Sequence, residues 1–258
     1  MSDPGRLAGK RALVTGGGRG IGAAIARRLA SEGAAVAINY VANASAANEL
    51  VSELEAKGHQ AAAFRADVAE RAQIKDLVAQ VVDAFGGLDI LASNAGVEHF
   101  GRLESIDDED FQRVFRINVA GQLFATQAAA EAMTSGGRIL LTSSISARIA
   151  VYAHTLYAAS KAAVSAMALN LAPELAEHGI AINAIAPGGT ATDMAADVAA
   201  KYTHPALREV PPALVTKSMN AIGRLAEPDE IAAVAAFLLS PDASYLTGAT
   251  IDASGGYI

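Results

Sequence analysis

Cysteine and tryptophan are absent from this chain of 258 residues, and aromatic residues make up only 5% of it. Without cysteine, neither a disulfide framework nor a thiolate metal site is possible, and we expect no bound metal. Charged residues are also scarce, at 18% against 52% hydrophobic residues. This balance excludes a disordered chain and is typical of a sheet covered on both faces.

Basic surface and long apolar runs are lacking too. The net charge of -7 argues against a nucleic-acid partner. The first ten residues hold no apolar signal-peptide core. The longest apolar stretches, such as 231–239, are far shorter than the ~20 residues of a membrane helix. We therefore expect a cytoplasmic protein with no membrane partner.

Short β-branched runs alternate along the chain with longer alanine-rich segments of helical period. The predicted strands are 11–15, 35–39, 60–65, 88–93, 138–143, 180–185 and 250–251. The predicted helices are 21–32, 44–57, 72–85, 108–133, 157–178 and 227–239. This order predicts right-handed βαβ units in a doubly wound parallel sheet of about seven strands, with helices on both faces. Because no linker or repeat interrupts it, residues 1–258 are expected to form a single α/β domain.

Residues 187–223 break this alternation, with four prolines and no clear strand. A connection this long is usually a functional lid or a disordered segment. Ligands of open α/β sheets bind beyond the carboxyl ends of the strands, and this segment directly follows one. We therefore favour a substrate lid over about residues 189–223.

A glycine-rich turn, TGGGRGIG at 15–22, lies between the first predicted strand and the first predicted helix. Glycines permit positive φ there and let the backbone approach a pyrophosphate at the helix N-terminus. A plain tight turn has a similar composition, but the position between strand and helix indicates a nucleotide site. The candidate residues are Gly16, Arg19, Gly20, Ile21 and Gly22.

The end of the second predicted strand bears on the choice of cofactor. An acidic residue there would bind the ribose 2′-hydroxyl of NAD and repel a 2′-phosphate. This chain has Asn39 and Tyr40 instead, with no acidic residue before Glu49. Arg19 can offer a planar cation to a phosphate. We favour NADP(H), and NAD(H) stays open if Arg19 is only a solvated loop arginine.

Tyr157 and Lys161 are four residues apart in a predicted helix, so their side chains share one face. A nearby ammonium would favour the phenolate and lower a phenol pKa from about 10, giving a general acid/base. The same spacing is common by chance on exposed amphipathic helices. Ser144 precedes Tyr157 by 13 residues, where a hydroxyl could donate to a carbonyl or alkoxide oxygen. A turn serine or helix cap is the alternative, and these arguments do not choose among Ser143, Ser144 and Ser146.

Jointly, the motifs resemble those of the short-chain dehydrogenase/reductase family, from about Lys10 to the C-terminus. In chain order they are TGGGRGIG at 15–22, Asn94-Ala95-Gly96, Asn118, Ser144, Tyr157-x-x-x-Lys161 and Pro187-Gly188. The resemblance implies a single-domain Rossmann fold and an NAD(P)-dependent oxidoreductase acting on CH–OH and C=O groups.

The resemblance also implies roles for the catalytic candidates. Tyr157 would protonate the substrate oxygen as hydride arrives from the nicotinamide, while Lys161 would lower the pKa of Tyr157 and hold the nicotinamide ribose. Ser144, whose register with Tyr157 selects it among the serines, would polarise the carbonyl. Asn118 would anchor a water in a proton relay; a helix-interior asparagine satisfied by backbone is the alternative.

Further cofactor contacts carry over from the same resemblance. Asp67 and Val68 would meet the adenine, although an ordinary strand-end helix cap is the alternative for Asp67. Thr192 would reach the nicotinamide carboxamide. The remaining candidates would line the cofactor or lie by the nicotinamide: Asn94, Ala95, Gly96, Pro187, Gly188 and Thr190.

Within the family, residues 186–194, the Asn39-Tyr40 strand end and the long lid resemble hydroxynaphthalene reductases and polyketide ketoreductases. A cyclic or aromatic-like ketone is then the expected substrate. A 3-oxoacyl-carrier-protein reductase is the alternative, and a non-catalytic NADP-binding sensor or scaffold a remote one. Helices 108–133 and 157–178 and the C-terminal 247–258 resemble the segments through which the family forms homotetramers. Candidate substrate contacts are Ser146, Tyr152, His154, Met194, Tyr202, His204 and Met219.

Overall fold

A parallel sheet of seven strands lies at the centre of the computed structural model, which describes residues 5–207 and 209–257. The strand order is β3-β2-β1-β4-β5-β6-β7, with every neighbouring pair parallel. The chain crosses from β3 back to β4 beside β1, so the predicted doubly wound sheet is confirmed. The strands are β1 (Arg11–Thr15), β2 (Ala35–Tyr40), β3 (Ala61–Arg65), β4 (Leu88–Ser93), β5 (Met133–Thr142), β6 (Ala181–Pro187) and β7 (Thr250–Ala253).

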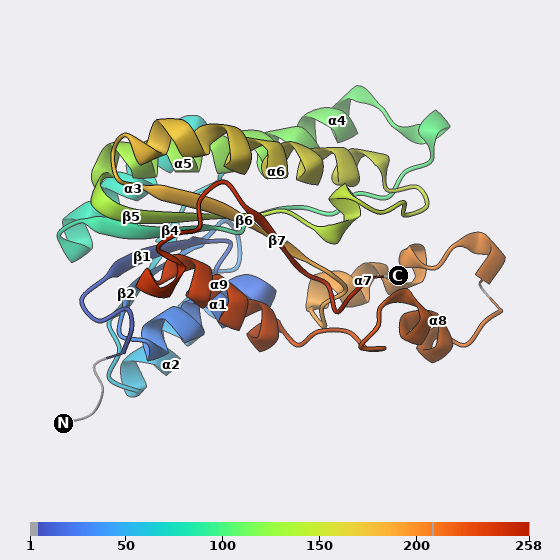
Figure 1. Cartoon of the computed structure of the whole chain (residues 1–258), viewed down its shortest axis with the longest axis horizontal. Helices are drawn as coiled ribbons and strands as arrows, with labels where there is room; N and C mark the ends of the chain where they lie inside the picture. The colour runs from blue at the N-terminus through green and yellow to red at the C-terminus, as the bar shows by residue number, and fades with distance from the viewer. Residues whose placement is uncertain (1–4, 208, 258) are drawn as a thin grey trace.

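Helices cover both faces of the sheet, as Figure 1 shows. Alternate residues of a strand point to opposite faces, and β1 illustrates the consequence. Ala12 and Val14 join the core on one side, whereas Leu13 joins the core on the other. The helices α1 (Gly20–Ser31), α2 (Ala44–Ala56) and α9 (Pro228–Leu239) lie on the first side, and α3 (Arg71–Phe85), α5 (Gly121–Ala132) and α6 (Thr155–Ala176) on the second.

The predicted helix 108–133 is interrupted in the structure. It consists of α4 (Asp108–Phe115), a π-helical turn at Arg116–Ala120, and α5. The Gly121 N–H donates to the Arg116 carbonyl, five residues back. A π-turn adds one residue without changing the local composition, so the helical period did not reveal it. Such turns occur frequently at functional sites, and Asn118 lies within this one.

The predicted lid segment is helical and has no strand among its described residues. It holds α7 (Asp193–Tyr202), a short 3-10 turn at Pro205–Leu207, and α8 (Pro212–Met219); Leu207 is followed by Arg208, which lies outside the described residues. In Figure 1, α7 and α8 extend beyond the carboxyl ends of the strands, apart from both helical layers. No residue of α7 is buried, so this segment is held by few core contacts.

In the part of the chain that the structure describes, no helix has the length and apolar character needed to cross a bilayer.

Candidate functional site

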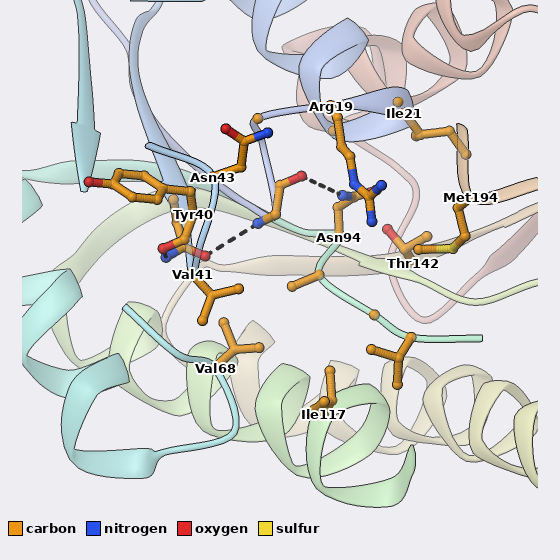
Figure 2. A pocket seen from close by; sticks show the side chains of 18 of the residues that line it. Arg19, Ile21, Tyr40, Val41, Asn43, Val68, Asn94, Ile117, Thr142 and Met194 are labelled. Atoms are coloured by element: carbon orange, nitrogen blue, oxygen red, sulfur yellow. Dashed lines mark hydrogen bonds between the residues drawn. The ribbon is translucent and has the colours of Figure 1, made fainter. Parts of the chain in front are cut away.

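A cleft of about 490 Å³ opens at the carboxyl ends of the strands. In Figure 2, Tyr40, Val41 and Asn43 lie on one side of it and Thr142 and Met194 on the other, with Arg19 and Asn94 between them. Other lining residues include Gly16, Gly18, Gly20, Ile21, Gly22, Asn39, Ala46, Ala66, Asp67, Val68, Ala95, Gly96, Val97, Ile117, Tyr157, Lys161, Thr192 and Asp193.

The glycine loop brings the backbone of β1 and α1 unusually close to its neighbours. A Cβ on Gly22 would lie 2.3 Å from the Gly16 carbonyl oxygen, and one on Gly16 would lie 2.9 Å from Ala95 Cα. Helix α1 therefore begins directly beside the strand ends. No side chain among the described residues caps its N-terminus, so N–H groups of the first turn can donate to a ligand. An anion in the cleft would satisfy them.

Two buried or half-buried asparagines hold this loop in place. Asn39 Oδ1 accepts from the Gly16 N–H at 3.2 Å, and its Nδ2 donates to the Ala66 carbonyl at 3.0 Å. Asn94 Nδ2 donates to the Thr15 and Gly16 carbonyls at 3.2 and 3.3 Å. Asn39 and Tyr40 both line the cleft from β2, but the amide of Asn39 already forms hydrogen bonds with the backbone.

The end of the cleft beside Tyr40 carries few side chains that would repel a phosphate. Among the described residues, no carboxylate forms an ion pair with Arg19. Asn43, which the sequence reasoning missed, accepts from the Ala46 N–H at 3.1 Å and caps α2. Its position directly after a strand and before a helix was an available signal. Asp67 Oδ1 accepts from the Ala69 N–H at 2.9 Å while lining the cleft, so a local turn and a ligand contact are both compatible with it.

The three neighbouring serines occupy different environments. Ser143 Oγ is 2.8 Å from the Lys161 carbonyl, to which it donates, and 2.8 Å from Ser165 Oγ, so it faces α6. Ser144 Oγ accepts from the Ser146 N–H at 3.1 Å and also hydrogen-bonds the Tyr157 side chain. Of the three hydroxyls, Ser144 is therefore the one beside Tyr157.

Tyr157 and Lys161 both line the cleft from α6. The Lys161 Nζ donates to the Thr142 carbonyl at 2.8 Å and lies 5.5 Å from the centre of the Tyr157 ring. Burial raises the pKa of Tyr157, the negative charge of Glu98 raises it further, and the Ser144 hydrogen bond opposes both. This direction is opposite to the lowering expected from Lys161. Burial lowers the pKa of Lys161 to about 8.

Asn118 is fully buried in the π-turn and joins two segments. Its Oδ1 accepts from the Val97 N–H at 2.8 Å, while its Nδ2 donates to the Val97 carbonyl at 2.9 Å and to Ser160 Oγ at 3.0 Å. The Gln122 amide donates to the Asn118 carbonyl at 3.1 Å. Two of the three hydrogen bonds of this side chain are to backbone atoms, as expected for a helix-interior asparagine satisfied by backbone. That backbone, however, belongs to Val97 in the loop after β4 and not to the helix itself.

Several predicted residues lie elsewhere. Thr192 and Met194 line the cleft, whereas Pro187, Gly188 and Thr190 are not among its lining residues. The Gly188 N–H instead donates to the Ala253 carbonyl at 2.9 Å, and Thr190 is buried. The substrate candidates Ser146, His154, Tyr202 and Met219 do not line this cleft either. Tyr152 lines a second cleft of about 250 Å³ and packs edge-on against His204.

A polar cluster beside Tyr157 joins two of the predicted substrate candidates, His154 and Tyr202, to Glu98, which sequence reasoning missed. The Glu98 carboxylate, with 11% of its side chain exposed, pairs with His154 Nε2 and accepts from the Tyr202 hydroxyl at 2.8 Å. His154 in turn stacks on the Tyr157 ring at 4.6 Å. The only local signal was an acidic residue two positions after Asn94-Ala95-Gly96.

Comparisons with known proteins agree with this geometry. Residues 16–258 match a family model described as enoyl-(acyl carrier protein) reductase. A hydroxynaphthalene reductase of Aspergillus fumigatus is 44% identical over 94% of this chain and 90% of its own length. A short-chain dehydrogenase of Burkholderia cenocepacia, solved in complex with NADP, superposes with a TM-score of 0.88 at 41% identity, covering 97% of this chain and 98% of the other. A 7α-hydroxysteroid dehydrogenase, solved with NADH and 7-oxo-glycochenodeoxycholic acid, gives a TM-score of 0.91 at 35% identity, covering 100% and 98%.

Proposed function

The chain belongs to the short-chain dehydrogenase/reductase family and is an NAD(P)-dependent oxidoreductase of CH–OH and C=O groups, and on that premise we propose that it is an NADPH-dependent ketoreductase. One observation carries the proposal. The same cleft holds an uncapped helix N-terminus and, farther along, Tyr157 with Lys161. An anion-binding end and a proton-donating end therefore share one cavity.

The residues present fit a dinucleotide. The first turn of α1 offers N–H donors to a pyrophosphate, and the glycine loop leaves no side chain in their way. A nicotinamide cofactor supplies the hydride when bound. Arg19, Tyr40 and Asn43 support a 2′-phosphate, because none of them is acidic and Arg19 is a cation without a carboxylate partner among the described residues. The Burkholderia relative with NADP agrees, whereas the steroid relative with NADH keeps NAD(H) in question.

The chain's own groups act on the substrate oxygen. In reduction, the Tyr157 hydroxyl gives its proton to the carbonyl oxygen as the carbonyl carbon accepts hydride, and the phenolate regains a proton from water. Ser144, hydrogen-bonded to Tyr157, orients and polarises that oxygen. Lys161 provides the positive charge that stabilises the transient phenolate. Asn118 holds the loop after β4 through two hydrogen bonds to the backbone of Val97, and Val97 lines the cleft.

We propose a cyclic or aromatic-like ketone as substrate. Tyr157 and Met194 line the cleft, and the buried His154 ring stacks behind the Tyr157 ring at 18°. Such flat and adaptable apolar surfaces suit a planar ligand. The hydroxynaphthalene reductase and the steroid dehydrogenase, whose names indicate ring substrates, support the same substrate class.

A 3-oxoacyl-carrier-protein reductase is the second candidate, because the matching family model carries a carrier-protein description. An acidic carrier would need free basic residues. Four arginines that are scattered in the sequence are the basic residues to consider, and each forms an ion pair: Arg102 with Glu104, Arg113 with Asp110, Arg116 with Glu70 and Arg148 with Asp252. These pairs favour the small ring ketone over the carrier-bound thioester.

The test is the loss of absorbance at 340 nm with NADPH, and separately with NADH, against a panel of ketones. The panel holds tetralones, hydroxynaphthoquinones, cyclic diketones and 3-oxoacyl thioesters. We expect rapid NADPH oxidation with ring ketones and slower oxidation of NADH. Preference for NADH, or turnover of acyl thioesters alone, would overturn the proposed cofactor and substrate.

We also propose a homotetramer, as the resemblance implies. Leu169 on α6 is 63% exposed, and a partner helix would cover it. Light scattering after size exclusion should give about four chain masses; a single chain mass would contradict this.

A further inference from the structure

Glu98 joins three segments that are distant in the sequence. It follows β4, whereas His154 immediately precedes α6 and Tyr202 is the last residue of α7. One carboxylate oxygen pairs with His154 Nε2 and the other accepts from the Tyr202 hydroxyl at 2.8 Å. Both oxygens are therefore used, each by a different segment.

The junction is in direct contact with the catalytic tyrosine. The His154 ring is 1% exposed and lies between Phe100, at 4.3 Å and 16°, and Tyr157, at 4.6 Å and 18°. Tyr202 packs edge-on against Phe100 at 4.9 Å. The bond to Glu98 orients the His154 ring, and Tyr157 stacks on that ring.

Helix α7 has few other tethers. None of its residues is buried. At its start, Thr192 caps it by accepting from the Ala195 N–H at 3.2 Å, but that bond is local. At its end, the bond from Tyr202 to Glu98 spans 104 residues of sequence. Among the described residues, this is the one side-chain hydrogen bond that ties α7 to a distant part of the chain.

The stacked rings of Phe100, His154 and Tyr157 form an aromatic wall beside Glu98. A carboxylate is costly to bury, and a neutral residue in place of Glu98 could support this wall at a lower cost in free energy. Resting on the proposed ketoreductase function, we propose that Glu98 is a positioning residue: its carboxylate latches α7 to the start of α6 and holds the site in its proton-donating form. The latch places the lid helix over the aromatic wall, and the charge acts on Tyr157.

The charge has a defined consequence for reduction. The groups that face Tyr157 are Glu98, Tyr202, His154, Ser144 and, from α6 itself, Lys161. The negative charge of Glu98 raises the pKa of Tyr157, after the larger effect of burial. A protonated phenol is the form that donates to a ketone oxygen. Removing the charge should lower the pKa of Tyr157. The fall in the rate of ketone reduction at high pH, which is the alkaline limb of the pH profile, should then begin at lower pH.

Two substitutions separate the latch from the charge. Glu98→Gln keeps the shape but removes the charge and weakens both hydrogen bonds, whereas Tyr202→Phe removes one hydrogen bond and keeps the charge. Glu104→Gln is the matched control, because Glu104 is an exposed acid whose ion-pair partner among the described residues is Arg102. Circular dichroism verifies that each variant is folded.

Hydrogen exchange of residues 193–202 reads the latch without any turnover. We expect exchange to rise about five- to tenfold in Glu98→Gln and in Tyr202→Phe, the scale of one lost hydrogen bond, and not in the control. The double variant should exchange no faster than Tyr202→Phe, because loss of the Tyr202 hydroxyl alone already removes the whole bond. Unchanged exchange in both single variants would overturn the latch.

The pH dependence of kcat/KM for ketone reduction reads the charge. In Glu98→Gln, the alkaline limb should move to lower pH by roughly one unit, whereas in Tyr202→Phe it should stay in place while KM rises. An unmoved limb in Glu98→Gln would reduce Glu98 to a packing role and overturn the positioning role. If the wild-type protein reduces no ketone, the proposed function fails, and hydrogen exchange still decides the latch.

Discussion

The two halves of the cleft are held together in different ways. Around the glycine loop, backbone packs directly on backbone, so a Cβ on Gly22 would lie 2.3 Å from a carbonyl oxygen. Around the lid, the described part of α7 has no buried residue and reaches the domain through the Tyr202–Glu98 bond. The first half tolerates only glycine at key positions and leaves a sequence motif. The second depends on side chains brought together by the fold, and leaves none.

This difference suits the division of labour that we propose. A pyrophosphate is the same in every reaction, so a rigid cradle can serve it permanently. A substrate pocket needs a covering segment that opens, and such segments come from the less stable parts of a protein. The two halves meet at Tyr157, which lines the cleft and stacks on His154. Substitutions can therefore be aimed at either half or at the point where they meet.

The largest effect is expected where the halves meet. Tyr157→Phe removes the proton donor but keeps the ring that stacks on His154. General acid catalysis contributes about 10²–10⁴-fold, so kcat should fall by about 10³-fold or more, while NADPH binding measured by fluorescence or calorimetry is retained. Tyr245→Phe, at a fully exposed tyrosine, is the control and should keep full activity. Normal turnover by the Tyr157 variant would exclude the proposed acid.

The rigid half is tested by Gly22→Ala. Helix propensity alone predicts stabilisation of about 1 kcal/mol, because Gly22 lies inside α1. The clash with the Gly16 carbonyl predicts the opposite sign, a loss of about 1–3 kcal/mol in the free energy of unfolding, with weaker NADPH binding. Gly18→Ala is the matched control, since its Cβ would approach nothing closer than 3.7 Å. Urea unfolding of both variants decides between the signs.

The sequence predicts the rigid half well, for a physical reason. Strands β1 and β4 begin and end at the predicted residues, because buried parallel strands are continuous apolar runs. The glycine loop is legible because backbone packing admits no side chain. The same reasoning named Asn39 and Tyr40 together; both line the cleft, and the Asn39 amide also holds the glycine loop, which the sequence did not reveal.

The half of the cleft around the lid was less predictable from the sequence. The π-turn at Asn118 changes a backbone register without changing composition. The cluster of Glu98, His154 and Tyr202 joins residues up to 104 positions apart, which no local pattern encodes. Pro187 and Gly188 show the limit of a motif from the other side: they pair with the end of β7 and do not line the cleft, and their contact with a nicotinamide stays a prediction.

A smaller effect is expected for Arg19→Ala, at the rim of the rigid half. Removing a charge-assisted contact of about 1.5–3 kcal/mol should raise the KM for NADPH by about 10- to 100-fold. The KM for NADH should change little, because it lacks the 2′-phosphate. Arg27→Ala is the control, because Arg27 lies within α1, pairs with Glu53 and does not line the cleft. Equal losses for both cofactors would mean that Arg19 contacts the pyrophosphate or only supports the loop.

The last prediction concerns the free energy of unfolding, which the burial of the Lys161 ammonium lowers. Burial lowers the pKa of Lys161 from 10.5 to about 8, so the folded protein disfavours the ammonium. Below pH 8 both states are protonated and the cost is complete. Between pH 8 and 10.5 the unfolded chain binds more protons, so the stability of the wild-type protein rises relative to a variant without the lysine. Lys161→Met should therefore be more stable at pH 7 by about 1–3 kcal/mol, and the difference should shrink towards pH 10.

The Thr142 carbonyl would keep a partner in this variant, because the Gln122 amide also donates to it, at 3.1 Å. Removing Lys161 therefore leaves no acceptor unsatisfied, and the expected gain is not offset by a lost hydrogen bond. Urea unfolding at pH 7 and pH 9.5 measures the difference, with the exposed Lys75→Met as the control whose difference should be the same at both pH values. A Lys161→Met protein that is less stable at pH 7 would show that the ammonium is stabilised by its surroundings, and that this part of the cleft belongs with the rigid half.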